Sequence, residues 1–337
     1  MVSLPSLGAI PMVGGVLRQQ LIAPIAASLS VDRLPFEQYT DPPGDPGLFG
    51  PGSATWRVHA DPAMLIGGLA ALLLQTLHPL AMAGVADHSN YRSDPLGRLS
   101  RTGSFVTGTT YGSTEAAERL IKLVKGVHRK VRGTAPDGRP YDAADPGLVT
   151  WVHATEVVNF LKAHQRYNPF PVRGDQADRY VHEMGVIAER LGAEEIPRSR
   201  VAIRAYFRRM RPELEAGEQC LDAVEFLTRP MPRRANPVMA GAHQVVVQAA
   251  VGILPGWARD MLGLRQPGLL DLALVRPAAL TMLTTLRLAA GEAPLIAEAR
   301  ARCAAEPEPT GSWTMAGWQP NTPTPTSSAA RGSPAST

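Results

Sequence analysis

The feature that most constrains the fold is the helical spacing of apolar residues, which recurs from Ala60 to near the end of the chain. Clear helix starts accompany this spacing. Asp61-Pro62 and Asp145-Pro146 each place a capping side chain before a proline at the first helical position. No segment alternates apolar and polar residues over the length of a strand. The sequence therefore predicts an all-α fold.

The composition divides the chain of 337 residues into three parts. Residues 1–50 are rich in proline and glycine and form an N-terminal extension. Residues 51–304 carry the helical pattern and form one domain. Residues 305–337 are rich in proline, serine and threonine, and we expect them to be disordered because they bury too little apolar surface.

Charge and cysteine content exclude several classes of protein. The formal net charge is only +4, and the sequence shows no basic run interleaved with aromatic residues, so we expect no nucleic-acid partner. Cys220 and Cys303 are too far apart for a disulfide framework or a metal pair. This usage predicts a cytoplasmic location. The N-terminus shows no basic region before its apolar part, so no secretory signal is expected.

One segment, residues 62–86, has the apolar composition of a membrane span, since it lacks Asp, Glu, Lys and Arg. His78-Pro79 interrupts it, and a proline disfavours helix at the residue before it. A helix that is apolar on all sides and buried in the core is the better interpretation. We expect no stable membrane span, while peripheral membrane contact remains open.

Two helices carry the histidines of greatest interest. The first begins at Ser113 or Thr114 and is expected to run to Arg132. Its apolar positions share one face and are Leu120, Leu123, Val124, Val127 and Val131. His128 lies on this face, so we expect it to point into the core. The second helix runs from Asp145 to about Tyr167 and bears His153 on its apolar face. Residues 79–112 look less regular, with a short helix near 96–102, and residues 134–144 form a polar loop. Further helices are expected at residues 175–191, 199–210, 218–228, 238–253, 257–262, 269–275 and 277–290.

A buried imidazole needs a partner for each ring nitrogen, and a metal is one such partner. Zinc and mononuclear iron sites are disfavoured because the sequence has no HExxH and no His-x-His. A carboxylate-bridged di-iron site needs Glu-x-x-His on two helices, whereas here His153 precedes Glu156. The sequence also lacks GxSxG, a dinucleotide fingerprint after a strand, and the CxxCH of covalently attached haem.

Haem b makes fewer demands: one axial histidine, an apolar slot between helices, and cations for its propionates. His128 meets the first, and Val124, Val127 and Val131 meet the second. The candidate cations are Arg98, Arg101 and Arg129. The residues alone permit haem without requiring it, and a helical protein in which the histidines only pack remains open.

The segment from Arg57 to about Tyr167 resembles the MpaB/rubber-oxygenase family, which includes the latex-clearing proteins. The order and spacing of several blocks carry this resemblance: TLHP at 76–79, GVADHS at 84–89, DPLGRLSRT at 94–102, YG at 111–112, VHRKVRG at 127–133 and YDAADPGLVTWVHAT at 141–155. The resemblance implies a globin-like helical core with additional helices, one haem b, and activation of dioxygen.

The resemblance also assigns roles to individual residues. It implies that His128 is the axial ligand and that Arg98 and Thr102 support the haem. Rubber-cleaving members have a lysine before that threonine, whereas this chain has Arg101, and their distal glutamate has no match here. Cleavage of polyisoprene is therefore not expected. His153, and secondarily His88, are candidate residues of the pocket.

The predicted function is a haem b-dependent oxygenase or oxidase that uses dioxygen and acts on an apolar small molecule. Two alternatives stay open at this point. One is a haem-binding protein without turnover, and the other is a helical structural module without a cofactor.

Overall fold

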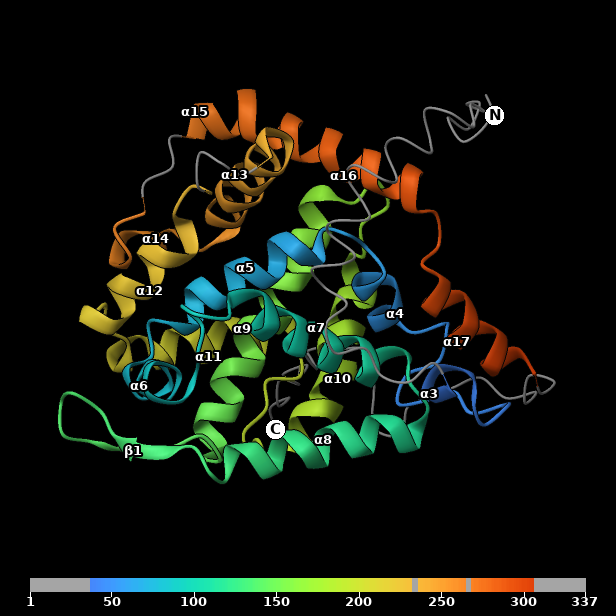
Figure 1. The fold of residues 1–337 in the computed structure, drawn as a ribbon, viewed down its shortest axis with the longest axis horizontal. Helices are drawn as coiled ribbons and strands as arrows, with labels where there is room; N and C mark the ends of the chain where they lie inside the picture. Colours follow the sequence, from blue (N-terminus) through green and yellow to red (C-terminus); the bar gives the residue numbers. More distant parts are fainter. Residues whose placement is uncertain (1–36, 232–235, 265–267, 306–337) are drawn as a thin grey trace, which may run out of the picture. The chain divides into compact units, whose positions relative to one another are not determined.

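The computed structural model describes residues 37–231, 236–264 and 268–305, in which helices form nearly all the regular structure (Figure 1). This confirms the all-α prediction. Residues 1–36 of the expected N-terminal extension and residues 306–337 of the expected C-terminal tail lie outside the described residues, whereas residues 37–50 of the extension are described. The helices are α3 (Glu37–Thr40), α4 (Ala54–His59), α5 (Met64–Gln75), α6 (Pro79–His88), α7 (Pro95–Tyr111), α8 (Thr114–His128), α9 (Pro146–Tyr167), α10 (Gly174–Leu191), α11 (Arg200–Met210), η3 (Arg211–Glu213), α12 (Glu218–Thr228), α13 (Pro237–Ile253), α14 (Gly256–Met261), α15 (Gly268–Leu270), η4 (Asp271–Val275), α16 (Arg276–Ala290) and α17 (Pro294–Ala304).

The predicted helix starts are confirmed where a polar side chain caps the first turn. The Asp145 carboxylate accepts a hydrogen bond from the Leu148 backbone N–H at 3.0 Å, and α9 then runs to Tyr167 as expected. The Ser113 hydroxyl accepts from the Ala116 N–H at the start of α8. Each cap satisfies an N–H group that the first helical turn leaves without a partner.

Four local predictions were wrong. Asp61-Pro62 does not open a helix directly: residues 62–63 form a turn in which the Asp61 carboxylate accepts from the Ala63 N–H at 2.8 Å, and α5 begins at Met64 without a capping side chain. The region expected to be irregular folds into α6 and α7, and α7 continues through Gly103 and Gly108 to Tyr111. Packing against neighbouring helices outweighs the low helix propensity of glycine there. The helix expected to reach Arg132 ends at His128. The expected polar loop contains a short antiparallel hairpin, β1 (Arg132–Thr134) and β2 (Pro140–Asp142), with Gly133 opposite Tyr141.

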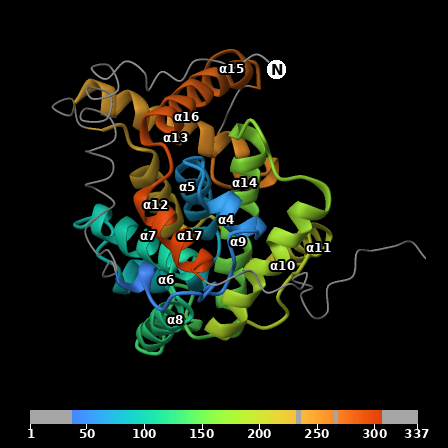
Figure 2. The ribbon, with the colours of Figure 1, turned by 90° about the vertical axis from the view of Figure 1, so that its right-hand side faces the viewer.

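Helix α5 is the centre of the fold. It lies in the middle of the ribbon in two perpendicular views, in contact with α9 and α13 (Figures 1 and 2). Ile66, Ala70 and Leu74 are buried on one side of the helix, Leu65, Leu69 and Leu72 are half-buried on the other, and no residue of α5 is exposed. The interpretation of this segment as a buried apolar helix is therefore confirmed, because apolar neighbours surround it.

The chain bends by 106° between α5 and α6, at the predicted His78-Pro79 break. In the described part of the chain, no single helix has both the length and the apolar composition of a membrane span. The bent pair α5 and α6 meets those two criteria together.

Close contact between α5 and α9 depends on Gly67. A Cβ atom at this position would lie 2.9 Å from the Asn159 carbonyl oxygen and 2.9 Å from the Phe160 Cα. Both atoms belong to the backbone of α9, so neither can rotate away. The next residue, Gly68, has room: its nearest neighbour would be the Phe160 ring at 3.8 Å. Only Gly67 is therefore required for the helices to approach.

We predict that Gly67→Ala lowers the free energy of unfolding by about 1–3 kcal/mol, because α5 and α9 must separate to admit the methyl group. Gly68→Ala is the matched control and should raise it by up to about 1 kcal/mol through helix propensity. Urea denaturation followed by circular dichroism measures both. Equal effects of the two substitutions would contradict this account.

Candidate functional site

His128 is the last residue of α8 and is half-buried. Its Nδ1 atom is buried and has no hydrogen-bond partner among the described residues. Burial lowers the pKa of His128, and the Asp142 carboxylate acts in the opposite direction. The histidine is therefore neutral near pH 7, with one ring nitrogen available for a ligand or a metal.

The apolar face predicted for α8 is only partly correct. Val124 and Val131 are half-buried, like His128. Leu123 and Val127 were expected in the core, but they are 64% and 52% exposed. Val124 lies one turn before His128 on the same side of α8, whereas Val131 follows the end of the helix. The half-buried apolar side chains that flank His128 in sequence are therefore Val124 and Val131, without Val127.

The hairpin that follows His128 is fixed to α6. The Tyr141 hydroxyl donates to the Asp87 carboxylate at 2.5 Å. The Tyr141 ring also packs on Gly84, where an added Cβ atom would lie 3.6 Å from it. His88, also on α6, hydrogen-bonds through Nε2 to the Arg132 carbonyl at 3.2 Å. Because that carbonyl can only accept, His88 carries its proton on Nε2. The structure therefore brings His88 to the strand that follows α8.

The three predicted site residues of α7, Arg98, Arg101 and Thr102, differ in burial. Arg98 is half-buried and donates from Nη1 to the Ser89 hydroxyl at 2.6 Å, which ties α7 to the end of α6. Burial lowers the pKa of Arg98, yet an arginine remains a cation in proteins. Arg101 and Thr102 are exposed, and Arg101 pairs with Asp94 at 3.4 Å. Arg98 is the one of the three that lies inside the fold.

His153 is buried on α9, and its Nε2 atom has no partner among the described residues. Burial, with a smaller contribution from Arg198, lowers the pKa of His153 to about 4. Arg198 belongs to the segment between α10 and α11, so His153 lies within electrostatic range of that segment. No described contact joins it to His128.

A second group of polar residues, which the sequence did not reveal, lies deeper in the fold. His59, at the end of α4, hydrogen-bonds through Nδ1 to the Thr110 hydroxyl at 2.8 Å and through Nε2 to the Tyr180 hydroxyl at 3.1 Å. Its ring also packs edge-on against Phe160 and Tyr180. These contacts join α4, α7, α9 and α10. No sequence signal marks them, because 121 residues separate His59 from Tyr180.

The hydrogen bonds fix the tautomer of His59. The Thr110 hydroxyl donates to the Val106 carbonyl at 2.6 Å, so it must accept from His59 Nδ1–H. Nε2 then has no proton and accepts from the Tyr180 hydroxyl. Burial, with a smaller contribution from His164, lowers the pKa of His59 to about 3, so the ring is neutral. The result is a one-directional chain of hydrogen bonds from α10 to α7.

Glu183 holds the start of α4 beside this chain. Its carboxylate is buried and accepts from the Thr55 N–H and hydroxyl, each at 2.8 Å, and from the Ala54 N–H at 3.3 Å. Arg179 adds an ion pair at 2.7 Å. These hydrogen bonds satisfy N–H groups of the first turn of α4 and hold its start against α10.

Glu156 is the remaining acid of this interior region. It lies on α9, three residues after His153, and forms no hydrogen bond or ion pair with another described residue. Burial raises the pKa of Glu156 to about 7. The pKa of Tyr180 is raised by burial and then by Glu156 and Glu183, so these groups lie within electrostatic range. A carboxyl group with a pKa near 7 can both give and take a proton at neutral pH.

Among the residues that the structure describes, no three His, Cys, Asp or Glu side chains come close enough to hold a metal ion together.

A family comparison defines the class of this chain. Residues 56–285, more than half of the chain, match the family described as ER-bound oxygenase mpaB/B'/Rubber oxygenase, catalytic domain. The chain belongs to this family, which confirms the resemblance inferred from the motif blocks.

Two mycobacterial relatives are 32% identical over 126 residues: Uncharacterized protein Mb2261 of Mycobacterium bovis and Uncharacterized protein Rv2237 of Mycobacterium tuberculosis. The aligned part covers 36% of this chain and 49% of each relative, so the chain spans about half the length of the curated relatives it matches. No solved structure matches the chain.

We predict that Tyr180→Phe lowers the free energy of unfolding by about 1–3 kcal/mol, because it leaves the buried His59 Nε2 without a donor. Tyr206→Phe is the matched control, since the Tyr206 hydroxyl is buried and has no partner. It should be neutral or slightly stabilising. Thermal and urea denaturation distinguish the two, and a neutral Tyr180→Phe would contradict the hydrogen-bond chain.

Glu156 should make stability depend on pH. Its carboxyl has a pKa of about 7 when folded against an ordinary 4.5, so the folded state holds the proton more tightly. Stability from this group is therefore complete below about pH 4.5 and is lost as the pH rises to about 7.

We predict that Glu156→Gln has little effect near pH 5 and stabilises by about 1–3 kcal/mol near pH 8, relative to the unsubstituted chain. The buried histidines have the opposite dependence, but they titrate in both proteins and cancel in the difference. Urea denaturation across this range measures it, and a difference that stays constant with pH would refute the assignment.

Proposed function

We propose that this protein is a haem b-dependent oxygenase or oxidase that acts on an apolar small molecule, with His128 as the axial ligand. Membership in an oxygenase family supports the reaction class. The observation that carries the proposal is the buried Nδ1 of His128, which lacks a partner, in a sequence block that matches the family's ligand block. A buried imidazole nitrogen without a partner destabilises a fold unless it has another use.

The residues that flank His128 in sequence, together with Arg98, are of the kinds that a haem needs. Val124, one turn before His128 on α8, and Val131, three residues after it, are half-buried and apolar. Arg98 supplies a cation inside the fold, and Arg129, directly after His128, supplies an exposed one. These are the groups that a haem requires of its protein: one imidazole, apolar walls and partners for the propionates. Arg101 fits less well, because it is exposed and paired with Asp94.

Haem held by an imidazole supplies the iron chemistry through which dioxygen is activated. The chain contributes the rest. His128 is neutral because burial lowers its pKa, and a neutral imidazole is the form that ligates metals. The hydrogen bond from Arg98 to Ser89 holds that cation in place at the junction of α6 and α7. Glu156 can exchange a proton near neutral pH.

The family resemblance links both Arg98 and Thr102 to the haem, but structural observations support only the role of Arg98. We assign Arg98 to a propionate or to ordering of the pocket, and its half-buried position and its hydrogen bond to Ser89 support this role. Thr102 is exposed, and its role rests on the resemblance alone. His153 and His88 remain secondary proposals, since His153 lies on α9 away from the described contacts of α8, while His88 contacts the hairpin.

We predict that the purified protein shows a Soret band, as isolated or after reconstitution with haem. His128→Ala should abolish the band, and His153→Ala should retain it, because His153 is buried elsewhere on α9. Absorption spectra and a pyridine-haemochrome assay for haem b measure both. A protein that stays colourless after reconstitution, or a band that survives His128→Ala, would overturn the proposal.

Turnover is tested separately from haem binding. Oxygen consumption that depends on an added apolar substrate identifies an oxygenase or oxidase. A Soret band without such consumption over a broad panel of hydrocarbons and terpenoids would assign the protein to haem binding without turnover.

A further inference from the structure

Helix α8 has a second chemical face, on the side away from His128. Residues 119–132 contain six arginine and lysine residues and no carboxylate. The carboxylates that precede this run are already paired: Glu115 with Arg119 at 2.6 Å, and Glu118 with Arg190 at 2.8 Å. Four cations form no ion pair with another described residue: Lys122, Lys125, Arg129 and Lys130.

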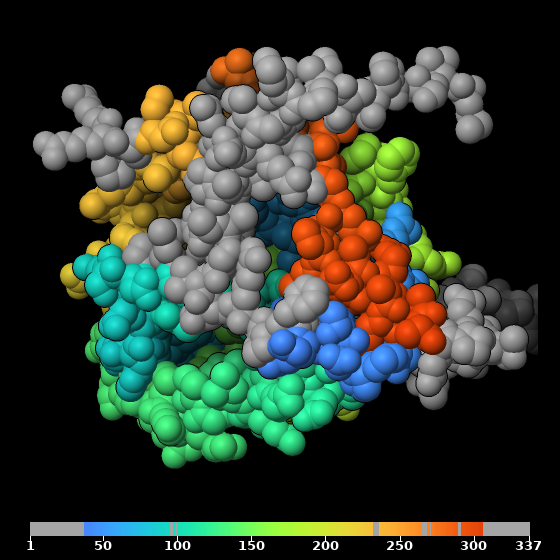
Figure 3. Space-filling view, turned by 45° about the vertical axis from the view of Figure 1, so that its right-hand side comes forward, coloured from blue at the N-terminus to red at the C-terminus, as the bar shows by residue number. Residues whose placement is uncertain are grey.

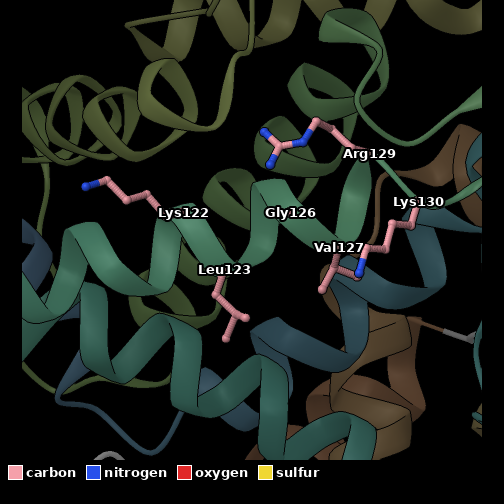
Figure 4. Close-up of a pocket in the computed structure, with 6 residues that line it drawn as sticks. All are labelled: Lys122, Leu123, Gly126, Val127, Arg129 and Lys130. Atoms are coloured by element: carbon pink, nitrogen blue, oxygen red, sulfur yellow. The ribbon is translucent and has the colours of Figure 1, made fainter.

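Two large apolar side chains are exposed within this run of cations. Leu123 and Val127 lie one helical turn apart and are 64% and 52% exposed. They point to the same side of α8 (Figure 4). With Lys122, Arg129 and Lys130 they line a shallow hollow of about 420 Å3. A single exposed leucine is ordinary, but an apolar pair bordered by unpaired cations is the pattern of a helix that lies on a membrane surface.

The position of α8 leaves this face accessible. In two perpendicular views, α8 runs along the lower edge of the ribbon (Figures 1 and 2). In the space-filling view, the green segment that includes α8 forms the lower border of the visible face (Figure 3). A flat partner can therefore approach α8 without any opening of the fold.

We propose that this α8 outer face, defined by Lys122, Leu123, Val127 and Lys130, docks the protein on an anionic lipid bilayer. The two lysines attract anionic headgroups, since each cation near such a surface contributes about 1 kcal/mol, or about fivefold in affinity. Leu123 and Val127 enter the boundary between headgroups and acyl chains, which removes their exposed surface from water. One partner, the bilayer, thus binds both the lysines and the apolar side chains of this face.

Charge complementarity favours a bilayer over the other partners for such a face. A second copy of the chain would place like charges opposite one another in a symmetric dimer. Nucleic acid would neutralise the lysines but would leave Leu123 and Val127 without apolar surface to contact. An anionic membrane satisfies both kinds of side chain.

The test is sedimentation of the full chain with vesicles of phosphatidylcholine alone or with about 30% phosphatidylserine. We expect binding only to the anionic vesicles, and weaker binding at higher salt. The double substitution Lys122→Glu/Lys130→Glu should reduce binding at least about tenfold, because it reverses two charges. Leu123→Ser/Val127→Ser should reduce it several-fold at unchanged net charge, which tests apolar insertion.

The matched control is Arg173→Glu/Arg208→Glu, which changes net charge equally at two exposed arginines of α10 and α11. It should leave vesicle binding within about twofold. An equal loss in this control would overturn the proposal, because net charge alone would then explain binding. Binding to neutral vesicles of equal strength would also overturn it.

Two further outcomes assign the face to another partner and likewise overturn the proposal. One is a concentration-dependent dimer in sedimentation velocity that Leu123→Ser/Val127→Ser abolishes. The other is binding to duplex DNA that Lys122→Glu/Lys130→Glu abolishes while vesicles do not bind. The far-ultraviolet circular dichroism spectrum confirms that each variant is folded. None of these readouts requires haem, so failure here leaves the haem proposal intact, and the reverse also holds.

Discussion

The contact between α5 and α9 is the constraint on which the rest of the structure depends. Gly67 lets the two helices approach until backbone meets backbone, with Asn159 and Phe160 filling the space that a Cβ would occupy. Phe160 then lies against the His59 ring, so the same contact supports the interior hydrogen-bond chain. The position of α9 also sets where Glu156 and His153 lie. The central packing and the polar interior are therefore one arrangement.

Polar and ionic contacts then connect the outer helices to this centre. Arg287 of α16 forms a two-pronged ion pair with Asp61, which also accepts from the Ala63 N–H at the start of α5. Arg302 of α17 is buried and donates to the carbonyls of Tyr39 and Gly112. Removing one partner of a buried pair leaves an uncompensated charge, so such contacts specify where each helix packs.

The sequence predicted the features that depend on neighbouring residues. A few neighbouring residues are enough to determine each of these features. They are the helix caps at Ser113 and Asp145, the break at His78-Pro79 and the apolar character of α5 on all sides. The family of the chain also followed from short blocks with fixed spacing. In these cases local chemistry and the final packing agree.

Features that depend on distant partners were not predictable. The apolar spacing of α8 treats Leu123 and Val124 alike, and only the neighbouring helices decide that one is exposed and the other half-buried. No local pattern indicates the role of His59, because its partners Thr110 and Tyr180 lie on two other helices. Likewise, Glu156 stood out in sequence only for its spacing from His153. Its unpaired burial follows from the packing of α9.

A comparison of His59 with His128 shows why the hydrogen-bond partners of the ring nitrogens matter for choosing a candidate ligand. His59 has a partner for each nitrogen, and its hydrogen bonds leave it one tautomer, so its place in the fold needs no further ligand. His128 has a buried Nδ1 without a partner, as do His78 and His243, and His153 has such an Nε2. Among these four, His128 ends its helix beside half-buried valines and is followed directly by exposed cations. A planar, apolar cofactor with anionic edges meets those three conditions together, whereas a water molecule would meet only the first.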